Sequence, residues 1–460
     1  MNRMAAACCA VVALWVSLPA AGAAAATHPG PSAVPAEQAA TATPIKHFVY
    51  LMQESRSFDE YFGTYPGADG IPDHVCMPRD LTQLSAGCVA PSHRGGEPTL
   101  EIRNALSTQR AQIDSGRMDG FVSAVRGDPA AADSVMGYYD DRELPWYWSL
   151  ADQYVLFDRF FASTAGGHVA NHMYWMAGTR GTSPTQDAVP AGGWGDNIAT
   201  VFDRLQAAGI PWKVYVRGYA ESNRAEASVS PSSQADVALA NRVPLLGMPR
   251  FRQDPALSSQ IVDLSEYYSD LQQGTLPSVA FVVPSGASSE HPPADVSIGQ
   301  AFVRGLVNEL MRSSAWDSSA FLMSYDDSGS SYDHVPIPAS SPDGTGYGLR
   351  VPALLVSPYA RRGKIDHTPL DATSGLAFIR ENWGIEPLAQ RDRTAPSFAS
   401  AFDFTSPSRP PVLVSDVRNP AVTLAAKTSA LYPAYGLALL IPVVIAFGTA
   451  RRTRKERHTR

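Results

Sequence analysis

Between residues 44 and 404, short apolar runs alternate with longer segments of helical periodicity, a pattern typical of an α/β domain with a largely parallel sheet. The helical segments are expected at 200–208, 298–312 and 373–383, and Phe302, Leu306 and Leu310 share one face of the second. No internal repeat interrupts this pattern, so the sequence predicts one large domain. Strands are expected at residues 46–52, 155–161, 212–216, 278–283, 320–325 and 353–356.

The first residues have the composition of an export signal. Arg3 precedes an apolar stretch over 5–18, and the alanine-rich run 20–26 offers small-residue cleavage sites, for example after Ala23. We therefore expect a signal peptide over residues 1–23 and a flexible Ala/Pro/Thr/Ser-rich spacer over 24–43. An uncleaved anchor is the alternative, but this apolar run is short for a membrane span.

The last residues predict a membrane anchor. Residues 431–450 read LYPAYGLALLIPVVIAFGTA without a charge, and the tail 451–460 is rich in arginine. A basic cluster directly after an apolar span is typical of the cytoplasmic side of a membrane. We therefore expect a stalk over 405–430, a transmembrane helix over 431–450 and a basic cytoplasmic tail over 451–460, with the main domain extracellular at the cell membrane.

Charge and cysteine content narrow the class of protein. The formal net charge is -7 although the tail is basic, so the rest of the chain is distinctly acidic, which argues against nucleic acid as a partner. Two of the four cysteines, Cys8 and Cys9, fall inside the predicted signal. In an oxidising compartment we expect Cys76 and Cys88 to form a disulfide, with two free thiols as the alternative.

Acidic residues follow two of the predicted strands. Glu54 comes directly after HFVYLMQ, and Asp326 and Asp327 come directly after AFLMSY. Open α/β sheets bind ligands at the carboxyl ends of their strands, and adjacent carboxylates repel unless a cation or proton intervenes. These positions are candidates for a metal site, although turns and helix caps explain many such residues.

Whole motifs resemble the bacterial phosphoesterase family that contains phospholipases C and a related acid phosphatase. The opening segment IKHFVYLMQESRSFDEYFGTYPGADG, residues 45–70, resembles the first motif of that family. The resemblance covers essentially all of residues 44–404. Further matching segments are GRMDGFV (116–122), NHMYWMAGT (171–179), SSEHPPADVSIGQ (288–300), YDDSGSSYDHVPIP (325–338), YGLRVPALLVSPYA (347–360) and RDRTAPSFASAFDF (391–404).

The resemblance implies an alkaline-phosphatase-like α/β fold that hydrolyses phosphate monoesters or diesters, with a metal-activated hydroxyl attacking phosphorus. It implies a divalent metal ion, whose identity the sequence does not give, and a phosphate-ester substrate. Carboxylate oxygens suit a hard cation, and an imidazole can donate to developing charge. The implied residues are the metal ligands Glu54, Ser55, Asp326 and Asp327, the phosphate-side group His291, and the substrate-binding residues Asn171, Glu290 and His334.

Several positions depart from the family pattern. Ser55 stands where the family has Asn, and in GGHVANH the position of the Ser or Thr nucleophile is His168. A family histidine aligns with Asn104, and the usual His-His pair falls near residues 248–250, which contain no histidine. A hydroxyl is a poorer neutral metal ligand than an amide oxygen, so these changes affect both metal binding and catalysis.

Two main interpretations remain open. In the first, His168 is the nucleophile, with Ser163 or Thr164 as nearby replacements, since imidazole can accept a phosphoryl group. In the second, the nucleophile is lost and the domain binds an anionic or phosphorylated ligand without turnover. A third, weaker interpretation is that the protein hydrolyses sulfate esters or phosphonates on the same fold. Surface or satisfied-core roles are expected for four other histidines, His47, His74, His93 and His172.

Overall fold

The computed structural model of the chain describes residues 40–95, 99–102, 105–181, 188–190, 192–219 and 234–414. Within them, an eight-stranded sheet has the order β13-β6-β12-β11-β1-β10-β8-β9. Only β12 runs antiparallel to its two neighbours, so the expected mostly parallel sheet is confirmed. The strands are β1 (His47–Gln53), β6 (Val155–Phe157), β8 (Trp212–Val216), β9 (Ile261–Asp263), β10 (Val279–Val283), β11 (Ser319–Tyr325), β12 (Ala353–Val356) and β13 (Lys364–Asp366).

Three two-stranded sheets lie outside the large one. They pair β7 (Phe160–Phe161) with β14 (Leu370–Asp371), β2 (Met77–Pro78) with β3 (Cys88–Val89), and β4 (Ser92–His93) with β5 (Gly137–Tyr138).

Helices cover both faces of the large sheet. The α-helices are α1 (Phe58–Phe62), α2 (Leu106–Ile113), α3 (Phe121–Ala124), α4 (Pro129–Ser134), α5 (Pro145–Gln153), α6 (His168–Ala177), α7 (Val201–Ala207), α9 (Gln234–Arg242), α10 (Arg250–Gln253), α11 (Pro255–Ser258), α12 (Ser265–Gln273), α13 (Val296–Arg312), α14 (Ala372–Trp383) and α15 (Gln390–Thr394). Short 3-10 turns are η1 (Leu84–Ala86), η2 (Asp114–Gly116), η3 (Pro244–Gly247), η4 (Trp316–Ser318) and η5 (Ala399–Ala401).

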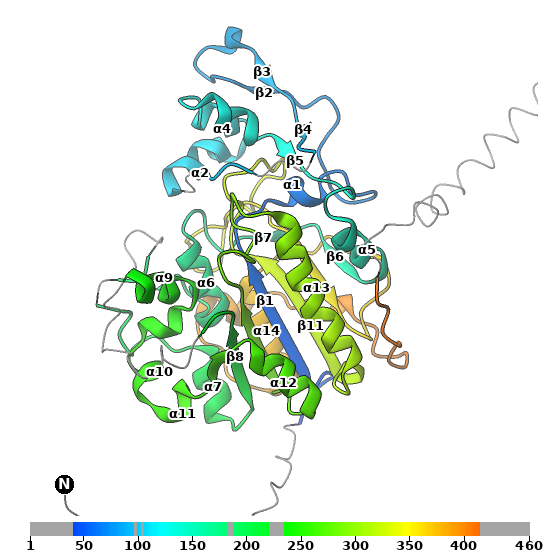
Figure 1. Ribbon diagram of the computed structural model, residues 1–460. Coiled ribbons are helices and arrows are strands. Elements are labelled where there is room, and N and C mark those ends of the chain that lie inside the picture. Colours follow the sequence, from blue (N-terminus) through cyan, green and yellow to red (C-terminus); the bar gives the residue numbers. More distant parts are fainter. Residues whose placement is uncertain are drawn as a thin grey trace, which may run out of the picture. The chain divides into compact units, whose positions relative to one another are not determined.

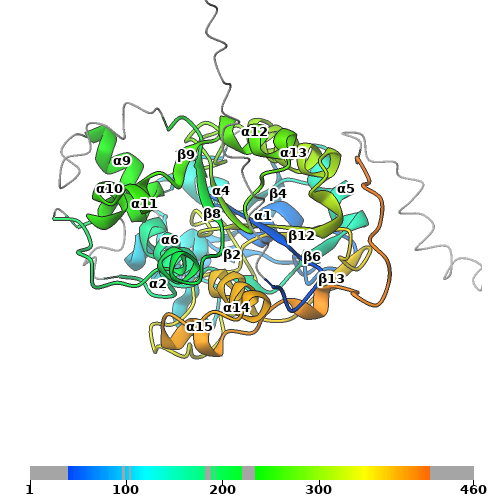
Figure 2. The same ribbon diagram turned by 90° about the horizontal axis from the view of Figure 1, so that it is seen from below.

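Aromatic side chains fasten these helices to the central strands. Figure 2 shows α12 and α13 on one side of the sheet and α6 and α14 on the other. Trp175 of α6 packs on Phe281 of β10 at 4.8 Å and on Tyr50 of β1 at 5.5 Å between ring centroids. Gly375 brings α14 close, because a Cβ there would lie 2.2 Å from the Tyr50 ring. The C-terminal part of α6 is thereby held against β1 and β10.

The sequence pattern predicted the long helices well. In α13, the expected face of Phe302, Leu306 and Leu310 is buried. Its N-terminus is capped by Asp295, whose carboxylate accepts a hydrogen bond from the backbone N–H of Ser297.

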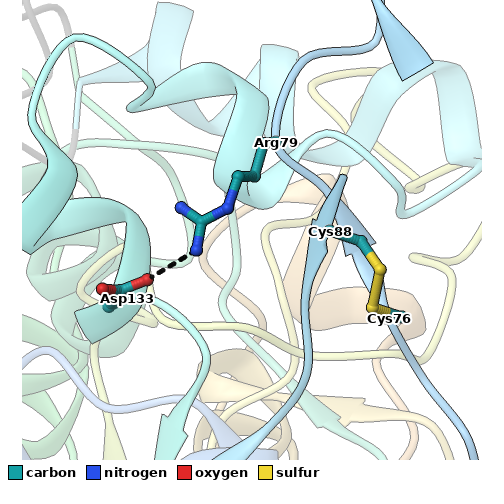
Figure 3. The surroundings of a disulfide bond; sticks show 4 residues. All are labelled: Cys76, Arg79, Cys88 and Asp133. Carbon is teal, nitrogen blue, oxygen red and sulfur yellow. Dashed lines mark hydrogen bonds and ion pairs between the residues drawn. A yellow bond between two sulfur atoms is a disulfide. The ribbon is translucent and has the colours of Figure 1, made fainter. Parts of the chain in front are cut away.

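A smaller set of elements, from β2 to β5, lies at the end of the sheet where β1 ends (Figure 1). Its own hydrophobic cluster includes Phe121 and Val122 of α3. Here Cys76 and Cys88 form the expected disulfide, and Arg79 pairs with Asp133 at 3.3 Å nearby (Figure 3). The disulfide therefore supports a part of the chain that has little sheet of its own.

One predicted strand is wrong in extent. Residues 155–161 form β6 and β7 in two different sheets, because the polar pair Asp158 and Arg159 interrupts the run. The Asp158 carboxylate accepts a hydrogen bond from the backbone N–H of Asp69 at 2.9 Å and contacts the His367 ring. These contacts turn the backbone away from the large sheet.

The ends of the chain are described only in part. Three predicted segments lie outside the described residues: the signal peptide over 1–23, the transmembrane helix over 431–450 and the tail over 451–460. Most of the predicted spacer and stalk also lie outside them. Among the residues that are described, no helix is long and apolar enough to cross a membrane. Packing extends slightly beyond the expected domain limits, since Ala42 donates to Asn382 O at 2.8 Å and Trp316 donates to Arg409 O at 3.0 Å.

Candidate active site

Three carboxylates gather where the parallel strands β1 and β11 end side by side. Glu54 follows β1, and Asp326 and Asp327 follow β11; all three are buried. Asp326 Oδ1 accepts hydrogen bonds from the backbone N–H groups of Ser55 at 2.8 Å and Asp327 at 2.6 Å. The expected acidic cluster at this edge of the sheet therefore forms.

The turn after β11 fits tightly against the turn after β1. Gly329 has a φ of 58°, and a Cβ there would lie 2.5 Å from the carbonyl oxygen of Ser55. Its N–H donates to Asp327 Oδ1 at 2.9 Å, and the Ser55 side chain also bonds to Asp327. Glycine at this position lets the two turns approach closely enough to bring their carboxylates together.

Two histidines of α6 approach the carboxylates. His168 and His172 are one helical turn apart, with ring centroids 6.4 Å from each other. Nε2 of His172 lies 3.6 Å from Asp326 Oδ2, and both side chains are fully buried. His172 is buried in the core, as one of the two expected roles has it, but its Nε2 is not satisfied there and its ring lies beside this cluster.

His291 completes the cluster from the loop after β10. Its electrostatic interaction with Glu54, Asp326 and Asp327 outweighs burial and raises its pKa. The loop is joined to β1 by a hydrogen bond from the Glu54 N–H to Ser289 O at 2.9 Å. His291 Nδ1 lies 2.7 Å from Pro292 O, which only accepts, so Nδ1 donates and Nε2 is left for another partner.

The charges of this cluster act strongly on one another. Burial, reinforced by repulsion from Asp326, raises the pKa of Asp327 to about 7. Burial lowers the pKa of His168, against the attraction of Asp326. For His172 the contact with Asp326 outweighs burial and raises the pKa. Positive charge is thus favoured beside Asp326.

Three buried atoms indicate what this site can hold. Glu54 Oε1, Asp326 Oδ2 and His172 Nε2 have no hydrogen-bond partner among the described residues. Such groups are costly to bury unless an ion, a proton or a water compensates them. Two carboxylate oxygens and an imidazole nitrogen are suitable ligands for a divalent cation. The chemistry of these donors therefore suits a cation, whereas the groups of described residues whose spacing alone could hold an ion are Asp59, Asp333 and His334, and His93, Asp140 and Glu143.

His172 is oriented as metal-binding histidines usually are. Its Nδ1 lies 2.8 Å from the carbonyl oxygen of Arg242, which can only accept. Nδ1 therefore carries a proton, and Nε2 faces Asp326. A second hydrogen bond of this kind commonly fixes the ring of a histidine ligand.

The structure gives Glu290 a different role from the expected substrate binding. Its side chain is fully buried, and its two carboxylate oxygens accept hydrogen bonds from Tyr147, Tyr61 and Tyr325 at 2.5, 2.5 and 2.6 Å. Gln53 Nε2 donates at 3.1 Å. Because protein donors occupy both oxygens, this side chain holds the loop that carries His291.

His334 also lies in a network of its own. Its Nδ1 is 2.7 Å from Asp59 Oδ2 and its Nε2 is 3.2 Å from Asp69 Oδ1. Asp59, Asp333 and His334 could together hold a metal ion by their spacing, but the buried guanidinium of Arg350 already pairs with Asp59 at 2.9 Å and Asp333 at 3.1 Å. Both ring nitrogens of His334 thus contact carboxylates of this ion-pair network, and its expected contact with substrate stays a prediction.

Asn171 shapes the turn that precedes α6. Its Oδ1 accepts from the N–H of Thr164 at 3.0 Å, and its Nδ2 donates to the carbonyl oxygens of Thr164 and Gly167, both at 3.3 Å. Asn171 is buried, so it positions His168 instead of meeting a substrate directly. Ser163, the nearby alternative nucleophile, has a buried hydroxyl without a hydrogen-bond partner among the described residues.

The sequence contained one indication that His172 belongs to the site. His168 and His172 are separated by four positions, which puts both rings on one face of a helix. Asn104, the counterpart of another family histidine, lies outside the described residues.

The comparisons with known proteins agree with the motifs. The family model described as Phosphoesterase family matches residues 45–386. Phospholipase C B of Mycobacterium tuberculosis is 29% identical over 425 residues, which cover 80% of this chain and 79% of that protein. The non-hemolytic phospholipase C of Pseudomonas aeruginosa is 28% identical over 427 residues, covering 80% of this chain and 58% of its own length.

Solved structures overlap less closely. The phosphonate monoester hydrolase of Agrobacterium radiobacter is 11% identical, with a TM-score of 0.38 and coverage of 78% of this chain and 77% of that one. A protein in the alkaline phosphatase superfamily from Vibrio parahaemolyticus is 13% identical, also with a TM-score of 0.38, and covers 76% and 70% of the two chains. At this TM-score neither overlap supports a conclusion about the site.

Proposed function

Because the chain belongs to the Phosphoesterase family and is a phosphoric ester hydrolase, we propose that it cleaves phosphodiesters in the manner of a phospholipase C. The observation that carries this proposal is a set of three buried atoms at the carboxyl edge of the sheet that have no hydrogen-bond partner in the described part of the chain: Glu54 Oε1, Asp326 Oδ2 and His172 Nε2. In a protein of this family, buried acceptor atoms that lack hydrogen bonds, next to the two further histidines His168 and His291, support catalysis more than passive binding.

Glu54, Asp326, Asp327 and His172 are the proposed holders of a divalent metal ion. Such an ion, when bound, supplies positive charge that polarises the phosphoryl oxygens. Ser55 contributes through its backbone N–H, which fixes Asp326 Oδ1, and through its side-chain hydrogen bond to Asp327. This arrangement leaves Asp326 Oδ2 directed away from the backbone and toward His172.

His168 is the proposed nucleophile. A ring nitrogen of His168 forms a bond to phosphorus while the bond from phosphorus to the leaving oxygen breaks, and water then hydrolyses the phosphohistidine. The turn bonded by Asn171 fixes the start of α6, so that the ring is held in place for attack.

His291 is the proposed acid. Its Nε2 can donate a proton to the departing oxygen, because Nδ1 is already bonded to Pro292 O. Glu290, the residue before His291, is held by hydrogen bonds from three tyrosines, and this keeps the His291 loop in place.

We further propose that the enzyme acts outside the cell, anchored at the membrane by residues 431–450. The disulfide between Cys76 and Cys88 supports an oxidising compartment. The predicted signal and anchor sequences support export and retention.

The test is hydrolysis of p-nitrophenyl phosphorylcholine, a diester, beside p-nitrophenyl phosphate, a monoester, by the purified full chain with Mg²⁺, Ca²⁺, Mn²⁺ or Zn²⁺. We expect metal-dependent release of p-nitrophenol with a higher kcat/KM for the diester. A preference for the monoester would reassign the protein as a phosphatase. No turnover of either ester, together with retained binding of phosphorylcholine, would favour the non-catalytic alternative.

A further inference from the structure

A cavity of about 400 Å³ lies beside the turn that leads into α6. This volume falls within the range of roughly 300–1,000 Å³ that is common for small-molecule sites. Its apolar wall includes Leu106 and Ile113 of α2 and Ile337, while Thr164 and Thr345 add hydroxyls. The lining therefore combines apolar side chains with hydroxyl groups.

Two arginines line this cavity, and no ion pair joins either of them to a described carboxylate. Arg110 of α2 and Arg180, just after α6, are exposed, and neither has a carboxylate partner within the described part of the chain. Two described carboxylates adjoin the lining, Asp114 beside Ser115 and Asp343 bonded to Thr345, and both already have cations of their own. Asp114 pairs with Arg117, and Asp343 pairs with Arg391 at 3.0 Å and accepts from Tyr174 at 2.5 Å. The chain has a net charge of -7, yet two guanidinium groups that pair with no described carboxylate line one cavity. This arrangement favours the binding of an anion in the cavity.

The cavity is physically connected to the candidate active site. Thr164 and Ala165 line it, and both belong to the turn that leads directly to His168. Helix α2 contacts the same turn, because the side-chain oxygen of Gln109 accepts a hydrogen bond from the N–H of Gly166 at 2.9 Å. Gln112 of the same helix donates to Ser330 O at 2.8 Å, in the turn that begins with Asp327. One helix therefore joins the cavity wall to both turns of the site.

We propose that this cavity binds a second anionic group, a phosphate or carboxylate, carried by the substrate beyond the ester that is cleaved. The proposal rests on the hydrolase function proposed above. Arg110 and Arg180 pair with the anionic group, and Leu106, Ile113 and Ile337 contact the adjoining carbon skeleton. Substrates with an anionic headgroup are then preferred over those with a zwitterionic one.

Direct binding tests the cavity without catalysis. Phenylphosphonate, which combines a non-hydrolysable anion with an apolar ring, is titrated into the full chain in EDTA by isothermal calorimetry. We expect saturable binding that weakens about tenfold or more in each of Arg110→Gln and Arg180→Gln, since a charge-assisted pair is lost. Arg204→Gln, an exposed arginine on α7, is the matched control and should bind as the parent does. Absence of binding in the parent, or equal binding in all four proteins, would overturn the proposal.

Substrate choice tests the same cavity during turnover. Dihexanoyl phosphatidylserine and dihexanoyl phosphatidylethanolamine differ by one carboxylate in the headgroup. We expect a higher kcat/KM for the serine lipid, and both cavity variants should lose this preference through KM while keeping turnover of the ethanolamine lipid. An unchanged preference in both variants would contradict the proposal.

The two experiments separate the possible failures. If neither lipid is hydrolysed under any metal, the phosphodiesterase function fails, while the phenylphosphonate titration still decides whether the cavity binds anions. A parallel titration with inorganic phosphate separates the sources of the anion. Binding of inorganic phosphate as tightly as phenylphosphonate would assign the cavity to free phosphate and overturn the substrate subsite.

Discussion

Nε2 of His172 lies 3.6 Å from Oδ2 of Asp326 inside the protein, and neither atom has a hydrogen-bond partner among the described residues. With Nδ1 bonded to the carbonyl oxygen of Arg242, both facing atoms are acceptors when the ring is neutral, so a proton, a water or a metal cation is needed to join them. His172 is therefore central to the proposed metal site, although the motif comparison did not single it out.

His172→Ala should lower metal affinity and activity together. We expect a decrease of about 10–100-fold in both, the range seen when groups that support a metal site are removed. The measurements are calorimetric titration with Mn²⁺ and hydrolysis of p-nitrophenyl phosphorylcholine. His74→Gln, which changes an exposed histidine outside the carboxylate and histidine cluster, is the control. Full metal binding by His172→Ala would remove this residue from the ligand set.

Tyr325→Phe should destabilise the protein because it removes one donor to the buried Glu290 carboxylate. Hydrogen bonds to charged groups contribute about 1.5–3 kcal/mol, and we expect a loss of that size in the free energy of unfolding. Urea denaturation followed by fluorescence measures it. Tyr268→Phe, a partly buried tyrosine on α12, should lose much less; equal losses in the two variants would mean that Glu290 gains nothing from its tyrosine partners.

Stability should depend on pH through His334. Burial alone would lower its pKa, but the hydrogen bond and charge of Asp59, with the charge of Asp333, outweigh burial and the opposing charge of Arg350 and raise it. A pKa raised by folding stabilises the protein fully below the unfolded value of about 6.5 and loses this effect as pH rises through the folded pKa.

The difference in unfolding free energy between the parent and His334→Gln should accordingly be larger at about pH 5.5 than at about pH 9, on either side of that transition. Urea unfolding at the two pH values measures it. A difference that is the same at both values, or larger at high pH, would show that the protonated ring does not stabilise the ion-pair network.

Reduction of the Cys76–Cys88 disulfide should mainly affect the elements around β2 and β3. The bonded residues are 12 positions apart in sequence, and a loop of this size constrains the unfolded chain by about 3 kcal/mol in the loop-entropy account. Cys76→Ser with Cys88→Ser should lower stability by about that amount. Turnover per folded molecule should change little, since neither cysteine belongs to the carboxylate and histidine cluster; a complete loss of turnover with normal folding would contradict this separation.

The sequence predicted the central strands because each is a run of apolar residues between polar turns. β1, β10 and β11 are buried along nearly their whole length, so their signal is strong. Strands β9 and β13 contain three residues each, too few for a periodicity to emerge. The break between β6 and β7 depends on contacts of Asp158 with residues far along the chain, which no local pattern contains.

The candidate site was predicted only in part for a similar reason. Carboxylates that follow buried parallel strands converge at one edge, so Glu54 and Asp326 could be identified. The roles of Glu290 and His334 depend on the tyrosines and on Arg350, whose side chains reach them from other elements. A motif shows which residues stand together in sequence, but not whether a side chain faces the site or the protein interior.

The most direct test of the proposed enzyme compares p-nitrophenyl phosphorylcholine hydrolysis by the parent and by Asp326→Asn, each stripped with EDTA and then supplied with metal. Asp73→Asn, an exposed aspartate, serves as the control. We predict turnover by the parent and by the control that requires metal, and a loss of about 100-fold or more in Asp326→Asn at saturating metal, consistent with removal of one of several cooperating groups. Equal turnover by all three proteins, or turnover that persists in EDTA, would contradict a metal-assisted site at the ends of β1 and β11.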